Sequence, residues 1–183
     1  LLIWAPYRYF FGGQTILVEG TAPEVRPVSF EVLDDMIYSI AESLFSNAEK
    51  QIDTRIRRLF FQSLKPSLDL NAVYYVRKIF NEIFQLLSEL ASSSQIPAFV
   101  SCDTVESERD AFAQYCFSLA QQLRDTPIPP AVQKGILYIL KYYKQDISLE
   151  TAADTLHLSK TYLSRAFKKL TGTQFVACVQ HLR

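Results

Sequence analysis

The sequence predicts a mainly α-helical protein. Only five of its 183 residues are glycine, and apolar residues recur at spacings of three and four along most of the chain, which is the period of a helix with one buried face. Hydrophobic residues make up 49% of the chain and charged residues 21%, so the collagen-like and intrinsically disordered classes are excluded. A chain of 183 residues can form one medium domain or two small ones.

Four helices are expected before residue 130. The first begins after Ser29, the second runs from about Ala48 to Leu64, the third runs from about Leu70 to Ala91, and the fourth ends near Arg124. Each has an apolar stripe that can bury one face. The residues expected to point inward are Val32, Leu33, Met36, Ile37, Ile40, Ala41, Leu44, Ile52, Ile56, Leu59, Phe60, Leu64, Val73, Val76, Ile79, Phe80, Ile83, Phe84, Leu87, Leu90, Ala111, Phe112, Tyr115, Leu119 and Leu123.

Local signals predict where three of these helices begin or end. Ser29 is a residue type that caps helix N-termini well. Pro66 has no backbone amide hydrogen, so the second helix is expected to stop there. Asp103, with Glu106 three residues later, resembles the acidic variant of a capping box and predicts the start of the fourth helix.

A short β-hairpin is expected near the amino terminus. Two β-prone runs, Tyr7–Phe11 and Gln14–Glu19, flank Gly12 and Gly13, and a Gly-Gly pair between two such runs is typical of a hairpin turn. The two glycines lack the surroundings of a phosphate-binding motif and are interpreted as a turn.

A proline-rich segment divides the chain at residues 126–130, where the sequence Thr-Pro-Ile-Pro-Pro cannot continue a helix. The charge changes at the same place. Residues 1–130 carry 11 Lys and Arg against 16 Asp and Glu, a net charge of −5, whereas residues 131–183 carry 8 against 3, a net charge of +5. The sequence therefore predicts a helical sensing, dimerisation or linker region over residues 1–125 and a basic module over residues 131–183 that meets an anionic partner.

Four short helices are expected in the basic module. The first covers about residues 131–143, the second and third begin after the N-cap residues Ser148 and Ser159, and Gly172 ends the third near Leu170. Thr173 is the expected N-cap of the fourth. The residues expected to point inward in the first two helices are Val132, Ile136, Ile139, Leu140, Leu149, Ala152, Ala153 and Leu156.

The third of these helices has two different faces. At about 100° per residue, an apolar stripe is formed by Leu163, Phe167 and Leu170. The roughly opposite arc carries Thr161, Ser164, Arg165 and Lys168. Two short helices joined by a three-residue turn are typical of a helix-turn-helix unit, whose second helix enters the DNA major groove. An arginine can bridge two acceptors on guanine, hydroxyl groups contact several base edges, and lysines meet phosphates.

The run ISLETAADTLHLSKTYLSRAFKKLTG over residues 147–172, followed by Phe175 and Arg183, resembles the first helix-turn-helix of the AraC/XylS family of bacterial transcription regulators. The resemblance covers residues 131–183 and implies a homeodomain-like helical subdomain. It implies that the base-contacting residues are Thr161, Ser164 and Arg165. It also implies that the residues nearer to the DNA backbone are Lys160, Tyr162, Lys168 and Lys169.

The same resemblance implies a cytoplasmic regulator. The family's DNA-binding domain has two helix-turn-helix units, and this sequence reaches Arg183 inside the helix that would join them. Residues 1–130 are similar to the signal-sensing or linker regions of AraC-type response regulators. The expected partners are double-stranded DNA, a second copy bound through the N-terminal helices, and a small-molecule or phosphorelay signal. No membrane partner is expected, because no run approaches about 18 apolar residues.

An alternative is a signal-sensing or dimerisation module whose truncated helix-turn-helix no longer binds DNA specifically. An enzyme is not expected, because no nucleophile–base pair or paired-carboxylate motif occurs. His157 is interpreted as a turn residue and His181 has no partner nearby in sequence, so neither a metal site nor a cofactor is expected. The three cysteines, which lack C-x-x-C spacing and fit a reducing cytosol, are Cys102, Cys116 and Cys178.

Overall fold

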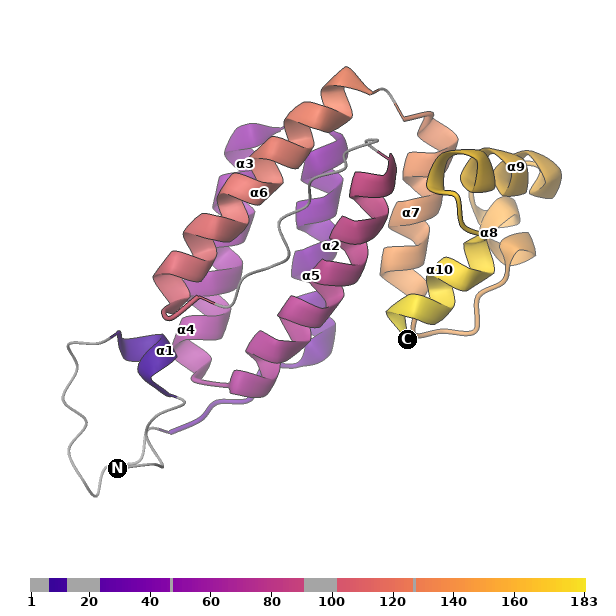
Figure 1. Ribbon diagram of the computed structural model, residues 1–183. Coiled ribbons are helices and arrows are strands. Elements are labelled where there is room, and N and C mark those ends of the chain that lie inside the picture. Colours follow the sequence, from indigo (N-terminus) through magenta and orange to yellow (C-terminus); the bar gives the residue numbers. More distant parts are fainter. Residues whose placement is uncertain (1–6, 13–23, 47, 91–101, 127) are drawn as a thin grey trace.

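The computed structural model describes residues 7–12, 24–46, 48–90, 102–126 and 128–183, and every regular element in these ranges is helical (Figure 1). The prediction of a mainly α-helical protein is confirmed. In chain order the elements are α1 (Arg8–Phe11), α2 (Phe30–Phe45), α3 (Glu49–Arg57), the π-helix η2 (Arg58–Leu64), α4 (Lys65–Ser67), α5 (Leu70–Leu90), α6 (Val105–Asp125), α7 (Pro130–Tyr142), α8 (Leu149–Thr155), α9 (Lys160–Thr171) and α10 (Phe175–Leu182).

The long helices form two layers. In Figure 1, α6, α5 and α10 lie in front of α3, α2 and α7. Helix α2 is central, since it packs against α3, α5, α6 and α7. A continuous cluster of buried apolar side chains extends from α1 to α10 and crosses the proline-rich segment. The predicted division into residues 1–125 and 131–183 stays a prediction, but the two parts share this core.

The N-terminus of α2 confirms one sequence prediction, and its exposed surface corrects another. Ser29 caps the helix, because its side chain accepts a hydrogen bond from the backbone N–H of Glu31. Leu33 and Ile37 are buried as expected, but Val32 is 46% exposed. Val32 lies about 120° around the helix from the centre of the buried stripe, in the first turn of α2.

The helix that begins at Glu49 does not stop at Pro66. It continues as α3, η2 and α4 and ends where Leu68 takes a left-handed conformation with φ of 55°. In an α-helix, a proline ring collides with the carbonyl group four residues earlier. The wider π turns before Pro66, which include a bond from the N–H of Lys65 to the carbonyl of Phe60, relieve this collision.

The start of α6 lies one residue later than predicted. Thr104 caps the helix by accepting a bond of 3.1 Å from the N–H of Ser107, and the Ser107 hydroxyl meets the N–H of Thr104 in return. Asp103 and Glu106 therefore do not form the capping box, and Glu106 instead pairs with Lys65. Within α6, Phe112 is buried as expected, whereas Ala111 is exposed.

The amino-terminal hairpin is not supported. The segment Tyr7–Phe11, predicted as a strand, contains α1, which Gly12 ends with a φ of 72°. Tyr9 and Phe10 are both buried in this helical turn, whereas in a strand two successive residues would face opposite sides. Gly13 and the second predicted strand, Gln14–Glu19, lie outside the described residues.

An ion pair between Arg77 of α5 and Glu108 of α6 lies inside the bundle. The Nε atom of Arg77 donates a bond of 2.8 Å to Glu108, whose exposed fraction is only 1%. The Tyr9 ring lies 5.4 Å from the Arg77 guanidinium carbon. Burial, and then the Glu108 charge, raise the pKa of the Tyr9 hydroxyl. This pair fixes α5, α6 and α1 relative to one another.

We predict that Glu108→Gln lowers the free energy of unfolding by about 3 kcal/mol, because it leaves the Arg77 charge without a compensating carboxylate. The double variant Arg77→Met/Glu108→Leu should lose less, since it removes both charges from the interior. Urea denaturation followed by circular dichroism measures both losses. Equal stability of Glu108→Gln and the unmodified protein would contradict this account of the pair.

Candidate nucleic-acid interface

The start of α8 is fixed by a capping box, as the N-cap prediction at Ser148 requires. The Ser148 hydroxyl accepts a bond of 3.1 Å from the N–H of Thr151, and the Thr151 hydroxyl accepts one of 3.0 Å from the N–H of Ser148. Ala152 and Ala153 are fully buried. Their small side chains let α9 approach α8 closely.

The turn between α8 and α9 has a defined geometry that depends on His157. The N–H of His157 donates to the carbonyl of Asp154 at 3.1 Å, and the N–H of Leu158 donates to that of Ala153 at 2.9 Å. These two bonds form a Schellman motif. His157 occupies its left-handed position with φ of 55°, which most L residues adopt only with strain. The interpretation of His157 as a turn residue is confirmed.

The limits of α9 agree with the predicted ones to within a residue. Ser159 caps the helix by accepting a bond of 3.2 Å from the N–H of Tyr162, and Gly172 ends it with a φ of 67°. The prediction for Thr173 is wrong, because Gln174 is the N-cap of α10 and makes no side-chain cap. The N–H of Thr173 instead donates to the Thr171 hydroxyl at 3.1 Å.

The inward face of α9 packs on α7 at a glycine. Leu163 and Phe167 are fully buried, as predicted. A Cβ atom at Gly135 would lie 3.4 Å from Cδ1 of Leu163 and 3.6 Å from Cδ2 of Phe167, so the missing side chain lets the two helices approach. Leu170 is only partly buried, and Thr171 completes the buried stripe in its place, because Thr171 lies one helical turn beyond Phe167.

The outward face of α9 carries the predicted DNA-contacting residues. The exposed ones are Lys160, Thr161, Tyr162, Arg165, Lys168 and Lys169. Ser164 is half-buried, since it lies at the edge of the apolar stripe. Glu150 of α8 pairs with Lys160 at 3.5 Å. Over the described ranges, Arg165, Lys168 and Lys169 have no carboxylate partner, and α9 itself contains no acidic residue.

A polar cluster joins the end of α7 to the bundle. Asp34 of α2 accepts hydrogen bonds from the hydroxyls of Tyr75 and Tyr143, the second at 3.1 Å, and Lys144 Nζ lies 2.5 Å from the other Asp34 oxygen. Burial is the main cause that raises the pKa values of Tyr75 and Tyr143. Partial burial is the largest single influence on the pKa of Lys144 and lowers it, but the hydrogen bonds and charges of Asp34 and Tyr143 together outweigh it, so the pKa is raised. This cluster fixes the orientation of α7, and through it that of α9.

Arg183, which follows α10, binds the segment that directly follows α7. Its Nε atom donates a bond of 2.6 Å to the carbonyl of Tyr143, and its guanidinium also contacts the carbonyl of Gln145. The sequence analysis did not identify this contact or the role of Asp34. Neither has a local signal, because the residues that meet are distant along the chain.

Comparison with protein-family models, with curated proteins and with solved structures gives no significant match for this chain. Among the described residues, no group of three or more His, Cys, Asp or Glu side chains is arranged to hold a metal ion. None of the described helices combines the length and the apolar character needed to cross a bilayer.

We predict that His157→Gly keeps or raises the free energy of unfolding, by up to about 1 kcal/mol, because glycine adopts a positive φ without strain. His157→Val should lower it by about 1–2 kcal/mol, since a β-branched residue is strained in the left-handed region. Thermal unfolding of the two variants measures the difference. Equal melting temperatures would show that the turn does not hold this conformation.

Proposed function

We propose that the chain is a sequence-specific DNA-binding transcription regulator of the AraC type and that α9 reads the major groove. The observation that carries the proposal is the two-faced character of α9. Its apolar face is fully buried on α7 through Leu163 and Phe167, so its cationic and hydroxyl-bearing face is directed outward. In helix-turn-helix proteins, the second helix of the unit enters the groove in this way.

The exposed residues supply the contacts that such a helix needs. Arg165 lies near the middle of the outward arc, where its planar guanidinium can donate two hydrogen bonds to O6 and N7 of guanine. Thr161, one turn earlier, offers a hydroxyl and a methyl group to base edges. Ser164 contributes from the flank of the helix. The residues placed for phosphate contacts are Lys160, Tyr162, Lys168 and Lys169.

The charge distribution favours one orientation on DNA. Residues 131–183 have a net charge of +5 and residues 1–130 a net charge of −5. In Figure 1, α9 lies at the end of the molecule remote from α3 and α1. A polyanion therefore attracts the end that carries α9 and repels the bundle, which steers the encounter.

In this proposal the bundle from α1 to α6 is the sensing or dimerisation region, and the protein acts in the cytoplasm. The polar cluster around Asp34 supports the link between the two parts, because it places α7 and α9 in a fixed orientation relative to α2 and α5. A signal that changes the packing of α2 against α7 would also change the presentation of α9.

The test is selection of binding sequences from a random duplex pool, followed by fluorescence-anisotropy titration at several salt concentrations. Arg165→Ala should weaken binding to the selected sequence by about 1–3 kcal/mol and leave random DNA nearly unaffected. Lys168→Ala should weaken binding to both kinds of DNA. It should also reduce the slope of the logarithm of the binding constant against the logarithm of the salt concentration by about one, because it removes one phosphate contact.

Arg58→Ala and Lys50→Ala are the matched controls, since they remove the same charges from exposed positions on α3 and at the start of η2, which continues α3. In Figure 1, α3 lies across the molecule from α9. Both should bind the selected sequence as the unmodified protein does. If selection enriches no sequence, or if all four variants bind alike, the proposal fails. The module without specific DNA binding would then be the better description.

A further inference from the structure

Two neighbouring helices of opposite charge form one face of the molecule. The charge of α2 is purely acidic, with four Asp or Glu residues and no Lys or Arg. The charge of α7 is purely basic, with two lysines and no acid. We call the exposed side of this pair the α2–α7 face. It consists of Asp35, Tyr38, Glu42, Lys134, Leu137, Tyr138 and Lys141.

The two helices lie side by side and run antiparallel. Asp34 pairs with Lys144, and the ammonium group of Lys141 lies 5.8 Å from the ring centre of Tyr38. Residue numbers therefore rise along α2 as they fall along α7. Lys141 therefore lies within about one turn of the level of Asp35, and Lys134 lies within about one turn of the level of Glu42. A lysine side chain is long enough to span such an offset.

Aromatic side chains occupy the middle of this face. Tyr38, Leu137 and Tyr138 are half-buried, and the Tyr138 ring lies 4.8 Å from that of Tyr142. Over the described part of the chain, Asp35, Lys134 and Lys141 have no ion-pair partner. Tyrosines at the centre with charged groups around them are characteristic of protein–protein interfaces.

We propose that the α2–α7 face is the dimer interface and binds the same face of a second copy of this chain. A two-fold axis parallel to the helices, between α2 and α7, places the acidic helix of each copy over the basic helix of the other. Asp35 then meets the partner's Lys141, and Glu42 meets the partner's Lys134. A two-fold contact must be complementary to itself, and this face meets that condition because it holds both charges in adjacent stripes.

This inference goes beyond the proposed function and does not depend on DNA binding. It names the surface through which two copies associate and predicts the residues that pair across it. Since α9 packs against α7 at Gly135, the dimer would hold two copies of α9 in a fixed two-fold relation. Two linked reading helices favour paired half-sites on DNA.

The first test is sedimentation equilibrium of charge-reversed variants. The unmodified protein should sediment at twice the chain mass of 21.0 kDa. Lys134→Glu/Lys141→Glu and Asp35→Lys/Glu42→Lys should each be monomeric, because each places like charges across both contacts. An equimolar mixture of the two variants should recover the dimer, since the heterodimer has opposite charges at every contact.

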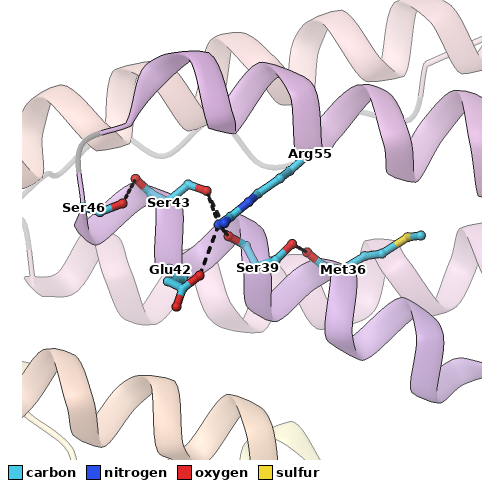
Figure 2. A network of polar contacts seen from close by, with 6 residues as sticks. All are labelled: Met36, Ser39, Glu42, Ser43, Ser46 and Arg55. Atoms are coloured by element: carbon cyan, nitrogen blue, oxygen red, sulfur yellow. Dashed lines mark hydrogen bonds and ion pairs between the residues drawn. The ribbon is translucent and has the colours of Figure 1, made fainter.

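Glu42 pairs with Arg55 of α3 at 3.4 Å, and it can be changed without releasing Arg55 from α2. Figure 2 shows that Arg55 also contacts the carbonyl of Ser39 and the hydroxyl of Ser43. Lys168→Glu/Lys169→Glu is the matched control, because it makes the same charge change on α9 and should leave the dimer intact. A monomeric unmodified protein, or a mixture of variants that stays monomeric, would overturn the proposal.

A second measurement needs no variant. A carbodiimide joins carboxylates to lysines that are in contact, so the unmodified protein, mixed as nitrogen-14 and nitrogen-15 forms, should give isotopically mixed peptides that link Asp35 to Lys141 or Glu42 to Lys134. Intermolecular links at these residues support the α2–α7 face. A cross-linked dimer without them would show that the copies meet elsewhere and would overturn the proposal.

Discussion

The contact between α9 and α7 is the constraint on which the candidate site depends. Phe167 and Leu163 lie against Gly135, where a side chain would fill the space between the two helices. Phe167 also contacts Phe175 of α10, with the ring centres 5.6 Å apart. Because these side chains are removed from water, the rotation of α9 about its axis is fixed. That rotation directs Arg165 and Thr161 outward, so the chemistry of the surface follows from the packing beneath it.

The acidic and basic parts of the chain share buried contacts but have net charges of opposite sign. The cluster around Asp34 of α2 brings Tyr75 of α5 and two residues that directly follow α7, Tyr143 and Lys144, to one carboxylate. Its polar groups pair with one another, which compensates the cost of removing them from water. Asp35 of α2 and the two lysines of α7 are exposed and have no ion-pair partner among the described residues. The proposed dimer contact uses α2 and α7, whereas the proposed DNA contact uses α9.

The correct predictions for the site rest on short-range interactions. Ser148, Ser159 and Gly172 act through hydrogen bonds to residues three or four positions away, and the apolar stripe of α9 follows from helical periodicity. The errors arise where a competing partner intervenes. Glu106 binds Lys65 instead of capping α6. The N–H of Thr173 donates to the Thr171 hydroxyl, and Thr173 does not cap α10. Tyr9 and Phe10 are both buried in a helical turn where the sequence predicts a strand.

The sequence by itself determined the helical class, the start of α8, the limits of α9 and the two faces of α9, because caps and periodicity act within one or two helical turns. Only the tertiary structure decided that α2 lies beside α7, that Gly135 receives Leu163 and Phe167, and that Asp34 binds Tyr143. The last contact joins residues 109 positions apart. No local pattern encodes such a pairing, since it forms only when the whole buried core brings the helices together.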